Sequence, residues 1–490
     1  MTVVKLDADL NRTYYRMHDA SDEAELAETF MAKRPSVDER LAAGKALREK
    51  VPRARHAEFK PQSDRPDPVE ILEKQNAARV QKLVPVRYAR MLATPFTFLR
   101  GSAAVMARDL SETPVTGLQV AACGDMHVSN FGVYASAERN LIFAINDFDE
   151  LHPGPWEWDL KRLAASAAVA VRFMGGNKTK AEEAAQECVK SYRKRMRRYA
   201  EMGFLEVWYE RIDDRAVLDV VSPRIRRNVE RVIDKARAKG HVQSLEKLTE
   251  EVDGQHRFVE DIPLIVRETH SDAGLPARDA LGRMLHAYLE SLTPDRRALL
   301  ARYRIVDAAR KVVGVGSVGT SCWMVLLQGV DGDDPLFLQV KQAQESVLAP
   351  YVSTKIFVKN QGERVVIGQR LTQGSPDIFL GWGAAGGGRD FYVRQLADMK
   401  GSVKFGEHDT SALSGFVEYC GLCGWALALA HAKSGDPAMI AGYCGNSDAL
   451  DEAIGQFALA YSKQTERDHA TLDAARRSGR IKVAAEKPVG

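Results

Sequence analysis

The alternation of apolar and polar stretches in the first third of the chain predicts a short β-hairpin with a loop at each end. An apolar run at 120–122 enters a Gly-Asp turn, and the apolar segment 131–134 leads into the polar loop 135–140. A third apolar run, 141–145, follows and ends in acidic residues. Short β-type runs bounded by turn-forming residues are typical of hairpins. We therefore expect the two flanking loops to lie side by side.

Longer patterns predict helices and a second group of strands. Apolar residues recur at helical spacing over 160–174, and 416–432 is apolar enough for a buried helix. The runs 322–327 and 336–341 flank a turn and predict strands. The segment 361–372 has the pattern of a further helix.

Three residues in the loops of the predicted hairpin are of the types that phosphoryl transfer needs. Asn130 follows Asp125 by five residues, and Asp147 follows the next apolar run. In such a reaction one carboxylate accepts the proton of the attacking hydroxyl, while an amide oxygen and a second carboxylate hold magnesium against the nucleotide phosphates. Taken singly, such residues are more often turn formers or helix caps. The hairpin that joins them favours a catalytic site.

A later glycine-rich stretch has the features of an ATP-binding loop. Gly314, Gly316 and Gly319 form a G-x-G-x-x-G run that includes Ser317, and Lys341 ends the second predicted strand after it. Glycines let backbone amides approach phosphates, and a lysine on a neighbouring strand can reach the phosphate oxygens. A dinucleotide fingerprint would instead require a helix at the third glycine. The strand pattern that follows favours a kinase-type glycine loop.

The order of these parts differs from that of ordinary protein kinases, in which the glycine loop and lysine come first. Here they follow the catalytic loop by almost two hundred residues. The apolar helix at 416–432 resembles the helix that leads into a kinase catalytic loop, so the order looks circularly permuted. Permutation is tolerated when the old termini are close and the new break lies at the surface. The segment 391–400 would then hold the last strand and a hinge, presenting backbone groups near Gln395, Leu396 and Ala397 to adenine.

Several longer strings resemble known families. The step from Gly154 to Leu160 is similar to one in sugar and aminoglycoside phosphotransferases, which implies that Asp159 buttresses the catalytic loop. Over nearly its whole length the chain resembles a bacterial family named domain of unknown function 2252. The strings that carry this resemblance are 83–91, 96–101, 123–132, 146–150, 154–162, 391–400 and 457–469. The resemblance gives the family, and the chemistry rests on the kinase-type motifs.

Three residues depart from the wider kinase pattern. Cys123 stands two residues before Asp125, where histidine is common. Asp149 replaces the glycine of Asp-Phe-Gly, and it either binds a second cation or caps the following turn. His127 lies inside the catalytic loop, where we expect it to brace the loop through hydrogen bonds while Asp125 acts as the base.

The acidic partner of Lys341 has two candidates. Glu345 lies about one helical turn beyond the lysine, and Glu363 begins the helix-like segment that follows. In kinases the pairing glutamate comes from the helix after this strand, which favours Glu363. Both assignments stay open at this point.

Composition limits the classes of partner and location. The chain has 490 residues, 45% of them hydrophobic and 28% charged, so it can form more than one core. A net charge of +3 gives no general attraction to nucleic acid, and the basic clusters 193–198 and 222–227 have the spacing of solvated helix faces. The N-terminus has no apolar signal region, and no run of about 18 uncharged apolar residues is present. Cys420 and Cys423 are typical of packed thiols. We expect a cytoplasmic protein that does not enter the membrane.

The fold class that these patterns favour is α+β, a kinase-like two-lobed fold with circularly permuted order. We expect a helical arm at 1–80, the catalytic loop and helical large lobe at 80–305, a strand-rich small lobe at 306–402, helices returning to the large lobe at 410–475, and a disordered tail after Arg477.

The sequence thus predicts a transferase that uses ATP and magnesium and acts on a hydroxyl acceptor. Asp125 would take the acceptor proton, Asn130 and Asp147 would hold the cation, and Lys341 would neutralise phosphate charge. A small-molecule acceptor is favoured, while a protein serine and the transfer of AMP remain open. Two other classes also remain open: a pseudokinase-type nucleotide-binding module, and a metal-dependent hydrolase built on the acids and His127. The sequence does not indicate an oligomeric state.

Overall fold

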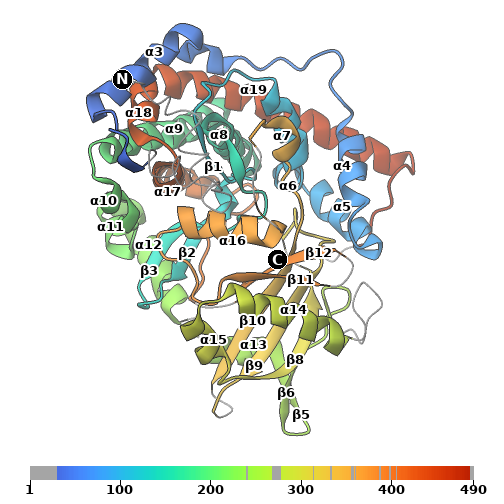
Figure 1. Cartoon of the computed structure of the whole chain (residues 1–490). Coiled ribbons are helices and arrows are strands. Elements are labelled where there is room, and N and C mark those ends of the chain that lie inside the picture. Colours follow the sequence, from blue (N-terminus) through green and yellow to red (C-terminus); the bar gives the residue numbers. More distant parts are fainter. Residues whose placement is uncertain are drawn as a thin grey trace.

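Six strands from the later half of the chain pair into one antiparallel sheet, drawn in the lower part of Figure 1. Their order across the sheet is β11-β12-β10-β9-β8-β7. The strands are β7 (Ile265–Val266), β8 (Arg304–Lys311), β9 (Cys322–Gln328), β10 (Pro335–Ala343), β11 (Gly381–Ala385) and β12 (Arg389–Gln395). The computed structural model describes residues 30–238, 241–267, 277–312, 314–330, 334–354, 358, 360–385, 388–396, 399–403 and 405–485.

Short elements lie before β7 and between the strands, and most of them pack against the faces of this sheet. They are α13 (His241–Leu248), β5 (Thr249–Val252), β6 (Gln255–Phe258), α14 (Ala277–Ser291), α15 (Pro294–Leu300), η4 (Ala349–Tyr351) and α16 (Gln361–Thr372). Because side chains alternate along a strand, Leu338 and Val340 of β10 face a core that includes α14 and α15. Phe337 and Lys341 face the opposite way. Residues of α13 and β6 cover Phe337, whereas Lys341 points toward the acidic hairpin.

The predicted hairpin is confirmed and lies between the sheet and the helices. Its elements and their neighbours are β1 (Gln119–Ala122), η3 (Val128–Asn130), β2 (Phe131–Ala135), β3 (Leu141–Ile145) and β4 (His152–Pro155). β2 and β3 pair antiparallel with Phe131 opposite Ile145, so the loops that precede β2 and follow β3 are adjacent. β1 pairs with β4, which closes the segment onto itself.

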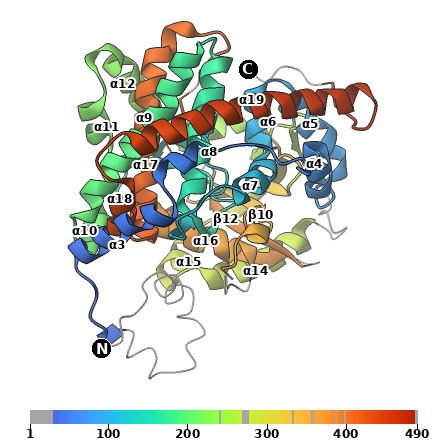
Figure 2. The same cartoon turned by 90° about the horizontal axis from the view of Figure 1, so that it is seen from above.

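A helical body with one large hydrophobic core supports the hairpin. Its helices are α8 (Trp156–Phe173), α9 (Lys178–Ala200), α10 (Phe204–Tyr209), α11 (Asp214–Val220), α12 (Pro223–Ala238), η5 (Thr410–Ala412), α17 (Leu413–Ser434), α18 (Pro437–Cys444) and α19 (Ala449–Arg477). α17 packs along α9 so closely that a Cβ atom on Gly424 would lie 2.1 Å from the carbonyl oxygen of Cys188. Figure 2 shows α19 crossing this body toward α4 and α5. The predicted helices at 361–372 and 416–432 are α16 and α17.

The segment before the hairpin is a string of short helices attached to the helical body. We call residues 30–111 the arm, because the helices of the expected arm continue past residue 80 to the end of α7 at Ser111. They are α3 (Val37–Lys50), η1 (Arg53–Ala57), α4 (Pro68–Asn76), η2 (Gln81–Leu83), α5 (Val84–Leu92), α6 (Pro95–Gly101) and α7 (Ala103–Ser111). Arg65 fastens it by ion pairs of 2.7 Å to both Asp109 and Asp468. The part of the predicted arm before residue 30 lies outside the described residues.

Two expectations about charged segments need correction. The tail after Arg477, expected to be disordered, is packed as far as it is described: Ile481 is buried, and Arg480 pairs with Glu73 at 2.7 Å. Within the basic cluster of α9, Arg193 is buried and pairs with Asp451 at 2.6 Å. Carboxylates of the same chain therefore neutralise part of the positive charge of these segments.

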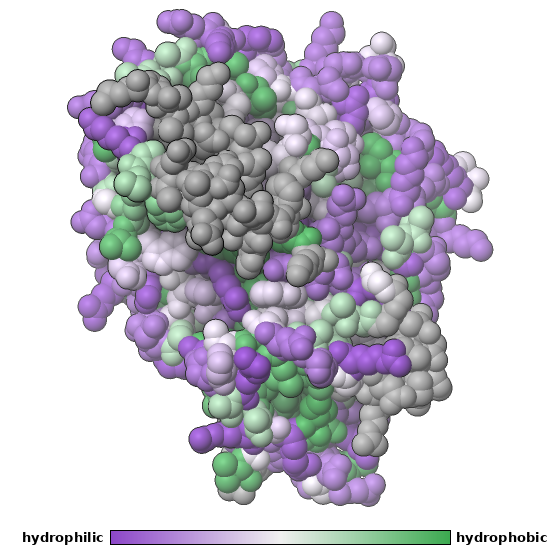
Figure 3. Space-filling view, in the orientation of Figure 1, coloured by the Kyte–Doolittle hydropathy of each residue, from purple (hydrophilic) through white to green (hydrophobic). Residues whose placement is uncertain are grey.

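The architecture is mixed helix and sheet, as the α+β expectation requires. Among the described residues one helical stretch, 410–434, is long and apolar enough to cross a membrane, but most of it is buried inside the protein, as in a core helix. All six cysteines are buried free thiols. On the face shown in Figure 3, hydrophilic side chains dominate the upper part, and the widest hydrophobic area lies over the lower, sheet-containing part.

We predict that Gly424→Ala lowers the free energy of unfolding by about 1–3 kcal/mol, because the added methyl group would overlap the backbone of α9. Gly282→Ala is the matched control, since Gly282 lies in α14 with open space around it. Helix propensity should make that variant about 0.5–1 kcal/mol more stable. Chemical denaturation measures both values, and equal stability of the two variants would contradict the packing of α17 on α9.

Candidate active site

Asp159 fixes the turn that carries Asp125. β1 ends in this turn, where the backbone N–H groups of Cys123 and Gly124 donate to the Asp159 carboxylate at 2.6 and 2.9 Å. Gly124 has a positive φ of 72°, and a Cβ atom there would lie 2.8 Å from the carbonyl oxygen of Glu150. Glycine is therefore required at this position, and Asp159 is a buttress as predicted.

Two side chains from distant helices hold the buttress in turn. His431 of α17 places its Nε2 atom 3.3 Å from Asp159, and its Nδ1 atom is 2.9 Å from the hydroxyl of Tyr192 on α9. All three side chains are buried. The turn before Asp125 is thus fixed by contacts that extend deep into the helical body.

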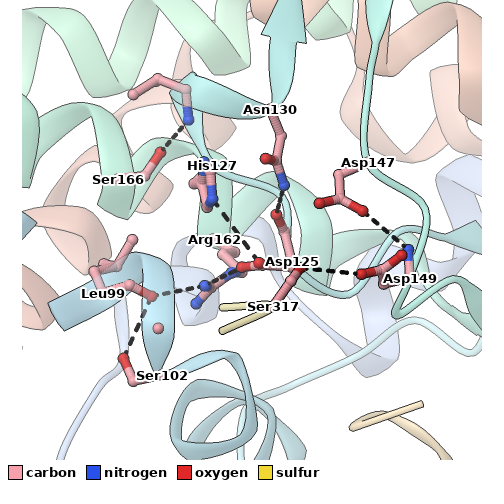
Figure 4. A network of polar contacts seen from close by, with 12 residues as sticks. Leu99, Ser102, Asp125, His127, Asn130, Asp147, Asp149, Arg162, Ser166 and Ser317 are labelled. Atoms are coloured by element: carbon pink, nitrogen blue, oxygen red, sulfur yellow. Dashed lines mark hydrogen bonds and ion pairs between the residues drawn. The ribbon is translucent and has the colours of Figure 1, made fainter. Parts of the chain in front are cut away.

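Arg162 orients the carboxylate of Asp125, as Figure 4 shows. Its Nε atom donates to Asp125 Oδ1 at 3.1 Å, and Nη2 donates to the same oxygen. Burial raises the pKa of Asp125 to about 6, with Arg162 opposing the rise and Asp147 adding to it. A carboxylate with this pKa is a base matched to neutral pH.

His127 and Asn130 flank Asp125 within the same loop. His127 Nε2 lies 3.8 Å from Asp125 Oδ2, and burial together with Arg100 and Arg162 holds the pKa of this histidine well below its usual value. His127 is therefore neutral. Its Nδ1 atom is buried and has no hydrogen-bond partner among the described residues, so the expected bracing through side-chain hydrogen bonds is not found. The Asn130 side-chain nitrogen donates to the Asp125 carbonyl at 2.6 Å, which leaves its amide oxygen for another partner.

The acidic loop after β3 meets Lys341 of the sheet. The lysine Nζ atom forms an ion pair with Asp149 and lies 3.7 Å from Asp147 Oδ1. Asp149 also accepts hydrogen bonds from the hydroxyls of Tyr392 at 2.6 Å and Ser317 at 3.3 Å. The strands β10 and β12 and the glycine loop therefore converge on a single carboxylate.

Electrostatics separates the two acids of this loop. Burial raises the pKa of Asp147, and the neighbouring Asp149 raises it further. For Asp149, burial acts in the same direction, but Lys341 outweighs it and lowers the pKa. Burial also disfavours the charged form of Lys341, but Asp147 and Asp149 raise its pKa well above the usual value. Asp149 and Lys341 thus remain ionised, and Asp147 is the acid that an added cation would stabilise most.

The structure gives Asp149 a partner that the sequence did not predict. Asp149 was expected to bind a second cation or to cap a turn; it is the main partner of Lys341, and the turn hydrogen bond is accepted by Asp147, from the Asp149 backbone N–H at 3.3 Å. The role of Asp149 as a cation ligand stays a prediction. The ion pairs of Lys341 are thus made with these two aspartates, where a glutamate, Glu345 or Glu363, was expected.

Helix α16 nevertheless contacts the acidic loop, but through an arginine. Arg364 donates to the backbone carbonyls of Asp149 at 2.8 Å, Leu151, and Gln344 at 2.7 Å. The backbone N–H of Glu363, one residue earlier, donates to the side-chain oxygen of the cap residue Asn360 at 2.7 Å. The helix following β10 is therefore coupled to the loop by main-chain contacts.

The glycine loop lies directly over Asp125. A Cβ atom on Gly316 would lie 3.7 Å from Asp125 Oδ2 and 3.1 Å from the carbonyl oxygen of Arg100. Gly314 and Gly319 have positive φ values of 63° and 89°, which glycine adopts readily. The arm anchors the loop, because Arg90 donates to the Gly314 carbonyl at 2.6 Å.

The predicted hinge lies apart from the acids, and its backbone N–H and C=O groups already form hydrogen bonds within the protein. The Gln395 N–H donates to Asp377, and the Leu396 N–H donates to the carbonyl of Phe337 at 3.0 Å. The carbonyls of Gln395 and Leu396 accept from the ammonium group of Lys400 at 3.1 and 3.4 Å. Ala397 lies outside the described residues.

Two cavities lie at this junction. The first, about 80 Å³, contains the acids and the glycine loop. The second, about 600 Å³, lies next to the hinge and is lined by residues that include Asn146, Arg394, Gln395 and Lys400. Arg394 of β12 bridges the sheet and the start of the acidic loop. It donates to the Asn146 carbonyl at 2.9 Å and to the side chain of Gln339 on β10 at 3.0 Å.

Sequence reasoning did not assign several side chains of the site. Arg162 and Tyr392 contact its acids, Arg394 contacts the carbonyl of Asn146 next to Asp147, and Arg87 and Arg100 line the smaller cavity. All five lie in the strings that carry the family resemblance, so those strings contained the signal. Their sequence positions alone did not show where the side chains point.

Comparison with known proteins agrees with that resemblance. No curated protein and no solved structure matches the chain. Residues 79–475, which include all the elements of the site, match the family described as "Uncharacterized protein conserved in bacteria", domain of unknown function 2252. The chain belongs to this bacterial family.

Proposed function

We propose that this protein is an ATP- and magnesium-dependent phosphotransferase with a kinase-like, circularly permuted fold. The proposal rests chiefly on the contact of Lys341 with Asp147 and Asp149, because it joins the late sheet to the early acidic hairpin at two aspartates that line the smaller cavity. Kinase sites combine a strand lysine, a glycine loop, a catalytic aspartate and a metal-binding aspartate in this way. Asp125 and Gly316 line the same cavity.

The order of elements in the sheet supports the kinase-like part of the proposal. The glycine turn joins β8 to β9, Lys341 lies on β10, and α16 separates β10 from β11. A glycine loop, a lysine on the third strand and a helix after it occur in that order in protein kinases. The chain differs in placing this unit after the catalytic loop.

The residues present fit a magnesium ion. The Asp147 side chain is 34% exposed and lies beside a second carboxylate, and the Asn130 amide oxygen is available nearby. Within the described ranges no group of three or more His, Cys, Asp or Glu could hold a metal by itself. Magnesium typically binds through one or two carboxylates and completes its shell with phosphates and water. When bound, it would neutralise charge on the transferring phosphate.

The side chains and the glycine loop would each have a separate role in the transfer reaction. Asp125, held by Arg162 and ionised near neutral pH, would accept the proton of the acceptor hydroxyl. Neutral His127 would lie beside it, 3.8 Å away, without adding charge, and the glycine loop would limit access of water. Positioning and electrostatic stabilisation would supply most of the rate enhancement.

The larger cavity has room for the nucleoside. Its volume of about 600 Å³ lies within the usual range of small-molecule sites, and it adjoins the predicted hinge. Because the hinge amides are already paired, side chains such as Gln395 and Asn146 would recognise the base. The phosphates would then extend past Arg394 toward Lys341.

We predict that Asp125→Asn reduces phosphate transfer by about 10²–10⁴-fold and changes nucleotide affinity little, since the variant loses the proton acceptor. Turnover of labelled ATP and titration with an ATP analogue measure the two effects. Asp219→Asn, on the exposed surface of α11, is the control. Unchanged turnover in Asp125→Asn would exclude Asp125 as the base, and binding without turnover in the wild type would favour the pseudokinase alternative.

We predict that Asp147→Asn raises the magnesium concentration for half-maximal activity by about 10-fold or more, because one ionised ligand is lost. A magnesium titration at saturating ATP measures this. The Asp219→Asn control should retain the wild-type value. The same magnesium dependence in both variants would show that Asp147 is not a ligand.

We predict that kcat/KM falls on the acid side with a pKa near 6, since Asp125 must be ionised to accept a proton. Activity is present above that pKa and is lost as the pH falls through it. Arg100 lowers the pKa of Asp125, so Arg100→Gln should move the acid limb to higher pH. A pH–rate profile checks both points, and an acid limb at the ordinary carboxylate pKa near 4 would contradict them.

A further inference from the structure

Three arginines from the arm line the smaller cavity without a carboxylate partner. Arg79 and Arg87 are buried, at 7% and 0% exposure, and Arg100 is partly buried. Arg79 donates to the carbonyl of Val318, and Arg87 donates to Gln75, Asn76 and Gly101. All of these acceptors are neutral. Across the described part of the chain, none of the three arginines has a carboxylate within ion-pair distance.

The guanidinium groups are also incompletely hydrogen-bonded. The Nε atoms of Arg79, Arg87 and Arg100 are buried and have no partner among the described residues. Burial lowers the pKa of each side chain, that of Arg79 to about 10, which reflects the cost of placing these charges away from water. Buried cations are normally paired with anions. An anion that enters the cavity would supply the missing partner.

The arginines lie close to the reacting groups. Arg100 interacts electrostatically with Asp125 and Asp147, and Arg79 interacts with Asp149 and Glu150. Asp125 and Asp149 already have their own cations, Arg162 and Lys341. Asp147 and Glu150 also line the cavity, but Asp147 shares Lys341, and Glu150 accepts a hydrogen bond from the Val347 N–H while burial raises its pKa to about 7. None of the four acids is thus ion-paired with Arg79, Arg87 or Arg100.

The size of this cavity suits a small anion. A volume of about 80 Å³ exceeds the roughly 10–15 Å³ that one water molecule needs and is far below the ~300 Å³ at which drug-sized sites begin. A tetrahedral phosphate group matches this size better than a nucleoside does. Arginine forks match phosphate oxygens through paired N–H donors.

We propose that Arg79, Arg87 and Arg100 form a phosphate-binding subsite beside Asp125. The subsite deepens the phosphotransferase function proposed above, and its role in catalysis rests on that function. The phosphate belongs either to the acceptor or to the end of the nucleotide triphosphate. In both cases the arm, which lies outside the sheet and the hairpin, contributes directly to ligand binding.

Calorimetric titration of the full chain with inorganic phosphate and with pyrophosphate, in buffer without magnesium, tests the subsite. Wild type should bind at least one of them at millimolar concentration or better, and Arg100→Gln should bind about tenfold or more weakly, the loss expected for one charge-assisted contact. Arg100→Lys keeps the charge without the fork and should fall between the two. Arg108→Gln on α7, which is outside the cavity, is the control and should bind like wild type.

Thermal unfolding of each variant establishes that it is folded before titration. Arg100 is chosen because no hydrogen bond ties it to the described residues, whereas Arg87 connects α4 to α6 through Asn76 and Gly101. Failure of phosphate and pyrophosphate to bind the wild type, or equal affinity in the wild type and Arg100→Gln, would overturn the subsite.

Competition identifies the source of the phosphate. If a non-hydrolysable ATP analogue with magnesium displaces bound phosphate and ADP does not, the subsite holds the terminal phosphate of the nucleotide. If the analogue and phosphate bind together, it holds a phosphate of the acceptor. A chain that binds phosphate through Arg100 but binds no ATP analogue would keep the subsite and overturn the phosphotransferase, so the two failures are distinguishable.

Discussion

The ion pair between Lys341 and Asp149, with Asp147 beside it, is the contact on which the candidate site depends. The lysine side chain is only 2% exposed, and a charge buried to that degree is tolerated only with close, hydrogen-bonded partners of opposite sign. Tyr392 and Ser317 donate to the same aspartate, so four elements from distant parts of the sequence meet at one carboxylate. Loss of this carboxylate would leave the buried ammonium group with Asp147 alone, at 3.7 Å, and would remove the shortest ionic contact between the sheet and the acidic loop.

A second balance of charges sets the chemistry of Asp125. Burial favours its neutral form and Arg162 favours its ionised form, with the result that the carboxyl group titrates near neutral pH. His127, less than 4 Å away, is held neutral by burial and by the neighbouring arginines, and so it does not compete as a charged partner. The same arginine-rich surroundings make the cavity favourable for anions, so a single environment can tune the base and attract a phosphate.

Much of the local structure could be predicted because it depends on short-range pattern. The β2–β3 hairpin, the strands β9 and β10 and the helices α16 and α17 follow from apolar periodicity and turn residues. The buttressing role of Asp159 was also predicted, from a family resemblance. The partner of Lys341 was not, because ion pairing depends on which carboxylate the tertiary structure brings near, and Asp149 is closer than either glutamate considered. The packing of the tail was not predicted, because the side chains that bury Ile481 belong to the arm, far away in the sequence.

The sequence by itself determined the family, the α+β class, the acids of the hairpin and the glycine loop with its lysine, since each is written in residues close together in the chain. Only the tertiary structure decided that these two groups share a cavity, that Arg162 orients Asp125, and that three arginines of the arm line the same space. The physical reason is that short-range pattern sets backbone conformation, whereas side-chain pairing is set by long-range packing. Desolvation then makes each buried charge depend on a partner that the local sequence does not contain.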